Sequence, residues 1–179
     1  MFISLVNSTS IYSTSLKTYT NFIKKSCYTT TYPSLCVKTL TPYASVVKTN
    51  SLKLCNTALN VAIQTTNNCS ATVSKLTSQK GITRPEAHVI KDCIGELKDA
   101  VYELKQTVNA MKHLGDGDRE FQWANAKTYA SAAITDADTC IDGFTERKVS
   151  LVVRNKIKSC ISGVEKHISN SLSLINHLY

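Results

Sequence analysis

The chain has 179 residues, of which only six are glycine and three are proline, and its formal net charge at neutral pH is +8. This length favours one domain with a substantial hydrophobic core, and the scarcity of helix breakers and of alternating strand patterns indicates a few long helices. No stretch reaches the roughly 18–20 apolar residues of a membrane span, so we expect no transmembrane helix.

The charges are segregated along the chain. Residues 1–85 contain nine Lys or Arg and no acid, whereas residues 86–146 contain twelve acids and six bases. Residues 147–179 contain six bases and one acid. Such blocks influence solubility and the encounter with partners more than they influence the fold. We therefore expect a polarised molecule whose acidic surface comes from the middle third of the chain.

The N-terminal region predicts a short helical hairpin. Residues 1–14 are rich in serine and threonine, and we expect them to be disordered or the remnant of a targeting segment. They lack the basic start and the apolar run of roughly 7–15 residues that a signal peptide has. Apolar side chains then recur at helical spacing on either side of Pro33, and Pro42 should kink the second helix. Residues 15–48 are therefore expected to form the hairpin.

Residues 50–179 predict a four-helix bundle. A cap at Asn50 or Ser51 and a capping box at Thr83–Glu86 mark the first two helix starts, and we expect Asp118 to cap the third helix. The buried stripe of the first helix repeats at steps of four and three residues, as in a bundle seam: Cys55, Leu59, Ala62, Thr66, Cys69, Val73 and Leu76. The third helix should bury Trp123, Ala130, Ile134, Ala137 and Ile141. Short connections force neighbouring helices to be antiparallel, so the fold class is all-α, an up-down-up-down four-helix bundle preceded by the hairpin.

No pattern in the sequence indicates an active site. A Gly-x-Ser-x-Gly motif, a His-Glu-x-x-His motif and a phosphate-binding glycine loop are all missing. The histidines show no ligand spacing, and we expect them on the surface or at helix ends: His88, His113, His167 and His177. Asp116-Gly117-Asp118 resembles the start of a calcium loop, but the later ligands are missing, which indicates a turn. We therefore expect no catalytic residue, no metal and no cofactor.

Basic residues recur at seven-residue intervals along the second long helix and just beyond it: Arg84, Lys91, Lys98, Lys105, Lys112 and Arg119. A seven-residue step drifts by only about 20° around a helix, so the helical members form one basic ridge. We favour a solvated face of the bundle as its explanation. The alternative is contact with a polyanion, of which nucleic acid is the weaker form because no aromatic residues interleave with the ridge.

Seven cysteines are many for an ordinary cytosolic domain, and they indicate disulfides formed in an oxidising compartment. Cys27 and Cys36 flank the hairpin turn, where a bridge is geometrically easy. Cys55 and Cys69 are 14 positions apart on one helix, hence about 21 Å, and cannot bond to each other. Either Cys55, Cys69 and Cys160 are small buried side chains at seam positions, or Cys160 is linked to Cys55 or Cys69.

Two glycosylation sequons fit the same compartment. They begin at Asn7 and Asn68, and such sites have meaning only in a secreted protein. We therefore expect a secreted, extracellular protein, although the given N-terminus contains no convincing signal peptide.

Four stretches of the sequence form a recognisable set: the pair Cys27 and Cys36 with Tyr32-Pro33 between them, Asp92-Cys93 followed by Asp99-Ala100, the segment SAAITDADTCIDGF at 131–144, and Ser169-Asn170-Ser171-Leu172. Together they resemble the plant invertase and pectin methylesterase inhibitor family. The resemblance extends over about 15–179, which the family would fill with one inhibitor domain. It implies the same bundle fold and a second disulfide, Cys93–Cys140, beside Cys27–Cys36.

The resemblance also implies the function, which is inhibition of an enzyme by docking over its substrate cleft, without catalysis or a cofactor. The Thr135–Phe144 segment is more similar to the pectin methylesterase branch of the family, and we find no Pro-Lys-Phe element of the kind that invertase inhibitors have. We expect a pectin methylesterase as the partner, at a ratio of one to one, and neither nucleic acid nor membrane. Inhibition of an acid invertase is the alternative, and direct binding of acidic polysaccharide by a basic helical module is an alternative of another class.

In this family, bundle helices contact the enzyme, and here the second and third long helices contain almost all the acids. We therefore expect the partner-binding residues on these two helices: Glu96, Asp99, Glu103, Thr135, Asp136, Asp138, Thr139 and Asp142. The local alternative is that Asp138 and Thr139 serve only the helix end.

Overall fold

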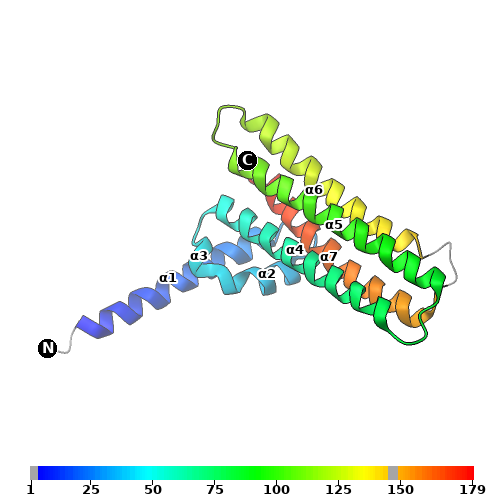
Figure 1. The fold of residues 1–179 in the computed structure, drawn as a ribbon. Helices are drawn as coiled ribbons and strands as arrows, with labels where there is room; N and C mark the ends of the chain where they lie inside the picture. Colours follow the sequence, from blue (N-terminus) through cyan, green and yellow to red (C-terminus); the bar gives the residue numbers. More distant parts are fainter. Residues whose placement is uncertain (1–3, 145–148) are drawn as a thin grey trace.

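The fold was obtained as a computed structural model, which describes the backbone of residues 4–144 and 149–179 and the side chains of residues 14–144 and 149–179. Four long antiparallel helices form its body: α4 (Ser51–Ser74), α5 (Arg84–Lys112), α6 (Arg119–Asp142) and α7 (Leu151–Asn176). A hairpin precedes them: α1 (Ser4–Cys27), α2 (Pro33–Leu40), the 3₁₀ turn η1 (Thr41–Tyr43) and α3 (Ala44–Val47). A second 3₁₀ turn, η2 (Lys75–Ser78), extends α4. The expected fold class is confirmed (Figure 1).

The bundle is a square in which α4 and α6 lie on opposite corners. α4 packs against α5 and α7, and α6 packs against the same two helices from the other side. The hairpin adds to the α4 and α7 side, so that it and α6 lie on opposite sides of the molecule (Figure 1). In the described part of the chain, no helix is both long and apolar enough to cross a membrane.

Helix α1 begins earlier than we expected. Residues 4–14, for which we predicted disorder, are helical, because no glycine or proline interrupts the chain before Pro33 and a helix grows more readily than it starts. The N-terminal part of α1 projects away from the bundle (Figure 1). The alternative origin of this stretch, a targeting remnant, stays a prediction, and residues 1–3 lie outside the described residues.

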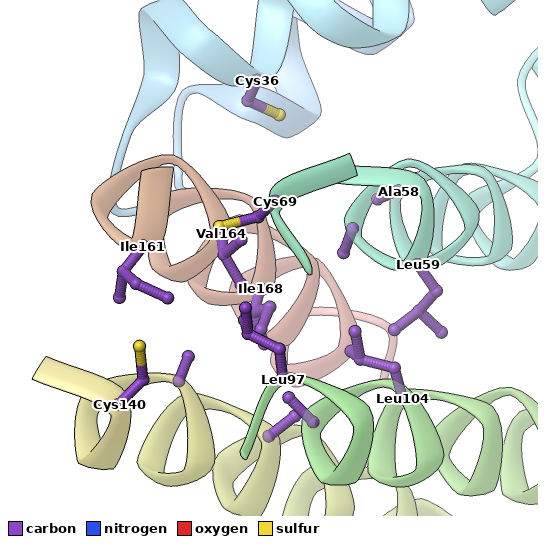
Figure 2. Packing of buried hydrophobic residues seen from close by; sticks show 14 of the residues in the cluster. Cys36, Ala58, Leu59, Cys69, Leu97, Leu104, Cys140, Ile161, Val164 and Ile168 are labelled. Carbon is purple, nitrogen blue, oxygen red and sulfur yellow. The ribbon is translucent and has the colours of Figure 1, made fainter. Parts of the chain in front are cut away.

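The core is aliphatic and is built from α4, α5 and α7. All seven predicted seam positions are buried, six of them on α4 and Leu76 on η2. Figure 2 shows Leu59 of α4, Leu97 and Leu104 of α5, and Val164 and Ile168 of α7 converging on one interior. Burial of each such side chain contributes about 1.5–3 kcal/mol to the free energy of folding.

The prediction was less accurate on α6. Ala130 and Ala137 are buried as expected, but Trp123, Ile134 and Ile141 are only partly buried. The core face of α6 is instead a row of small side chains: Ala126, Ala130, Ala133, Ala137 and Cys140. Small side chains allow close approach, and α5 and α6 form the most extensive helix pair in the molecule. The larger apolar residues then cover the flanks of this contact.

Helix ends follow the local sequence at most positions. Asn50 caps α4 by accepting a hydrogen bond from the Lys53 amide at 2.8 Å, and Pro42 lies in η1, which separates α2 from α3. Thr83 and Glu86 form the expected capping box. The prediction for Asp118 was wrong, because its side chain makes no capping hydrogen bond and its backbone is not in the extended conformation that a cap needs.

A buried asparagine fixes the hairpin to the bundle. Asn170 of α7 accepts a hydrogen bond from the Tyr32 amide at 2.8 Å and donates one to the Tyr32 carbonyl at 3.0 Å. Its side chain is 4% exposed. The side-chain amide of Asn170 thus gives a hydrogen-bond partner to both the backbone amide and the backbone carbonyl of Tyr32, as a neighbouring strand would.

Candidate functional site: the acidic face of α5 and α6

Disulfide bonds hold the elements around the site. Cys27 is bonded to Cys36 across the hairpin turn, with Cα atoms 5.5 Å apart. Cys93 of α5 is bonded to Cys140 of α6, with Cα atoms 4.4 Å apart. By chain entropy alone, closing the 48-residue loop of the second bond stabilises the fold by about 4 kcal/mol. This bond fixes the C-terminal end of α6 against the N-terminal third of α5.

The structure also decides among the alternatives for the remaining cysteines. Cys69 of α4 is bonded to Cys160 of α7, with Cα atoms 5.6 Å apart, while Cys55 is a free buried thiol. The reason is geometric: α4 packs against α7, and the two helices present these residues at the same level of the bundle. Burial raises the pKa of the Cys55 thiol to about 12.

A groove opens beside the Cys93–Cys140 bond. Its volume is about 310 Å³, and it is lined by Val89, Asp92, Cys93, Glu96, Thr139, Cys140, Asp142 and Gly143. Three of the predicted contact residues, Glu96, Thr139 and Asp142, therefore meet here. Asp92 was missing from the predicted set. Its position four residues before Glu96 was the available signal, since residues four apart share a helix face.

The acidic face continues from this groove along the line where α5 meets α6. Burial raises the pKa of Glu96, Glu103 and Asp136, and the nearby charge of Asp99 raises all three further. One carboxylate oxygen of Glu103, Oε2, is buried without a hydrogen-bond partner. Among the described residues, no Lys, Arg or His forms an ion pair with these three carboxylates. They are crowded and partly desolvated, which is a costly arrangement for a purely structural surface.

Not every predicted residue joins this face. Asp138 lies toward α7, where its charge contributes to raising the pKa of Glu165. Thr135 and Thr139 are exposed, and each hydroxyl donates to the carbonyl four residues earlier in α6. The Thr139 oxygen can still accept a hydrogen bond from a partner. The basic ridge is separate, with Lys91, Lys98, Lys105 and Lys112 exposed along α5.

The chemistry of this face is that of recognition. Its carboxylates can accept hydrogen bonds and attract cationic side chains, and Thr139 adds a neutral acceptor. Among the described residues no group of three or more His, Cys, Asp or Glu side chains is placed to hold a metal ion. Of the sequon asparagines, Asn68 is exposed on α4, whereas the side chain of Asn7 lies outside the described residues.

Fold and site together define a disulfide-linked helical bundle with an acidic face on α5 and α6. The family model described as plant invertase/pectin methylesterase inhibitor matches residues 21–174, so the chain belongs to this family. It is 38% identical to pectinesterase inhibitor 4 of Arabidopsis thaliana, covering 89% of this chain and 81% of that protein. It is 37% identical to pectinesterase inhibitor 11 of the same plant, covering 87% and 79%.

A more distant relative and a solved structure agree with this assignment. The 21 kDa protein of Daucus carota is 32% identical, with 87% of this chain and 82% of that protein covered. A crystal structure of a mutant pectin methylesterase inhibitor from Arabidopsis superposes with a TM-score of 0.62 over 86% of this chain and 94% of that chain. At 24% identity, that likeness concerns the fold.

Proposed function

We propose that this protein inhibits pectin methylesterase by docking the acidic face of α5 and α6 over the enzyme's substrate cleft, one inhibitor to one enzyme. The observation that supports this most is the unpaired, partly desolvated set Glu96, Glu103 and Asp136 beside the Cys93–Cys140 groove. Carboxylates in this state gain from a partner that supplies hydrogen-bond donors or cations. The relatives named pectinesterase inhibitors support the choice of enzyme.

The fold suits such a role because the face is rigid. The Cys93–Cys140 bond and the close packing of α5 on the alanine row of α6 hold the contact residues in place before binding. A preorganised surface loses little conformational entropy on association. The inhibitor needs no covalent step and performs no catalysis itself.

An extracellular location accompanies this proposal. Three disulfide bonds are stable in an oxidising compartment, and the sequon at Asn68 is exposed. The family acts on enzymes of the plant cell wall, and we place this protein in the same space.

A parallel titration tests the proposal. Purified protein is added to a plant pectin methylesterase and, separately, to a cell-wall acid invertase, and residual activity is measured in each. We expect stoichiometric loss of the methylesterase activity and no loss of the invertase activity. Inhibition of the invertase alone would assign the protein to the other branch of its family, and inhibition of neither would reject the proposal.

A further inference from the structure

The side of the molecule opposite to α6 has no acidic residue of its own. From residue 14 to residue 85, which includes α2, α3 and α4, the chain has basic residues and no carboxylate. All acids except Glu165 belong to residues 86–146. The segregation seen in the sequence is therefore a segregation between two opposite sides of the fold (Figure 1).

The positive charge is joined by aromatic rings at the hairpin turn. We call this surface the hairpin-turn patch and define it by Lys24, Lys25, Tyr28, Tyr32, Lys38 and Lys166. The Cys27–Cys36 bond holds the end of α1 against the start of α2, so the two segments that carry the first five residues adjoin each other. Lys166 joins them from α7, with its Nζ atom 5.8 Å from the centre of the Tyr32 ring.

Both tyrosine rings are open to solvent. Tyr28 is 83% exposed and Tyr32 is 37% exposed, and Asn170 fixes the backbone of Tyr32. Lys24, Lys25 and Lys38 are also exposed. Glu165, which adjoins Lys166 in sequence, interacts electrostatically with both Lys166 and Asp138 of α6. Lys24, Lys25 and Lys38 lie on a stretch of the chain that has no acid. The patch thus combines these exposed cations with tyrosine rings that lie outside the core.

We propose that the hairpin-turn patch binds a linear polyuronate, with lysines on successive carboxylates and the tyrosine rings against the apolar faces of the sugar rings. A polyanion with bulky apolar faces fits cations and exposed aromatic rings together, whereas cations alone would suit any polyanion. The choice of a uronate polymer over a phosphate polymer rests on the proposed function, since a pectin methylesterase leaves carboxylates along the pectin chain.

This placement would leave both partners bound at once. The patch belongs to the hairpin and α7, and the acidic face belongs to α5 and α6 on the other side of the bundle. An inhibitor held on demethylesterified pectin would then be concentrated where its target enzyme has already worked.

Binding to immobilised polygalacturonate at low ionic strength, with no enzyme present, tests the inference. The variant Lys24→Gln/Lys25→Gln/Lys38→Gln should bind about tenfold more weakly, the loss expected from three exposed ion pairs. The matched control Lys91→Gln/Lys98→Gln/Lys105→Gln removes the same charge from the basic ridge and should change the dissociation constant less than about twofold. Equal losses in the two variants would mean that only net charge matters, and would overturn the inference.

Three further arms make the result specific. Tyr28→Ala should weaken binding severalfold, and unchanged binding would remove the ring contact from the account. Immobilised pectin that is fully methylesterified should not retain the protein. The protein should also bind single-stranded DNA more weakly than polygalacturonate, and DNA binding of equal strength would indicate a phosphate partner instead. The hairpin variant should inhibit the methylesterase normally on short soluble substrates, so that failure of the proposed function and failure of this inference give different results.

Discussion

At the residue scale, the acidity of a side chain depends on its surroundings more than on its residue type. Glu86 and Glu103 are both glutamates on α5, but hydrogen bonds lower the pKa of the first and burial raises the pKa of the second. Glu86 accepts hydrogen bonds from the amides of Thr83 and Ser150, which lower its pKa to about 2. Glu103 has an oxygen without a partner, and burial and neighbouring acids raise its pKa.

The first prediction concerns Glu103 and pH. An acid whose pKa is raised in the folded state destabilises the fold once it ionises, so the cost is present at neutral pH and disappears below the ordinary pKa of about 4.5. Glu103→Gln should therefore raise the melting temperature at pH 7 by about 1–2 °C and leave it unchanged near pH 4.

Glu86 provides the opposite control. Its lowered pKa means that its contribution is present above pH 4.5 and is lost as the pH falls toward 2. Glu86→Gln should lower the melting temperature at pH 7 and do so less at acid pH. If Glu103→Gln destabilised the protein at neutral pH, the desolvation of this carboxylate would have to be rejected.

The second prediction counts thiols. Three disulfides leave Cys55 as the free thiol of the chain, and burial keeps it protonated, with a pKa of about 12. A thiol reagent should not react with the native protein at neutral pH. In denaturant without reductant, it should react with one thiol per chain. Detection of three thiols per chain would show that Cys69 and Cys160 are not bonded.

At the element scale, periodicity predicts the buried face of a helix well where apolar residues are clearly distinct from the polar residues around them. Every seam position predicted between Cys55 and Leu76 is buried, because the apolar residues of this stretch stand among polar ones, but the buried Leu54 and Ala58 were missed. On α6 the core positions are alanines, which differ little from their neighbours, so the larger Trp123 and Ile134 were wrongly placed at the centre. Local signals at helix starts succeeded at Thr83 and failed at Asp118, whose conformation depends on the preceding turn.

The candidate site was predictable to a similar degree. Charge counting placed the acids on α5 and α6, but positions two apart in one helix point about 200° apart, so Asp136 and Asp138 face different helices. The role of Asn170 was not predicted from physical reasoning. A polar residue among the apolar positions of α7 was the available signal, and only the fold shows that it faces the hairpin turn.

The third prediction follows from Asn170. Asn170→Ala removes two hydrogen bonds and leaves the Tyr32 amide without its partner, while the Tyr32 carbonyl keeps the hydrogen bond that it accepts from the Cys36 amide at 3.0 Å. The change should therefore cost about 1–3 kcal/mol. Native-state hydrogen exchange should show earlier opening of the Tyr32 amide than of the α4–α7 core. Because the Cys27–Cys36 bond remains, the hairpin itself should stay closed. Exchange at Tyr32 identical to that of the unsubstituted protein would contradict this account of hairpin docking.

At the scale of the whole molecule, the charge segregation and the fold act together. The bundle separates an acidic side, formed by α5 and α6, from an acid-free side, formed by the hairpin and α4. Opposite charges on opposite sides orient a molecule during its encounter with a charged partner and increase the association rate at low salt. The fold gives each side a rigid support, so one small domain can present two independent surfaces.

The fourth prediction tests the central claim, that the acidic face is the inhibitory surface. Asp99 is exposed, and its charge raises the pKa of its acidic neighbours, so Asp99→Ala relieves repulsion and should not lower the melting temperature. Thr139→Ala removes an exposed hydroxyl whose bond within the helix is of little consequence for stability. Any loss of inhibition in these variants therefore reports on contact with the enzyme.

The most direct measurement is the inhibition constant against a responsive plant pectin methylesterase for the unsubstituted protein, Asp99→Ala, Thr139→Ala and the ridge variant Lys105→Ala. Melting temperatures are recorded on the same samples. We expect the two acidic-face variants to lose inhibition, by about tenfold or more if the lost contact is desolvated, while Lys105→Ala stays within about twofold. Loss of inhibition in Lys105→Ala, with normal inhibition by Asp99→Ala and Thr139→Ala, would contradict the account and place the enzyme on the basic ridge.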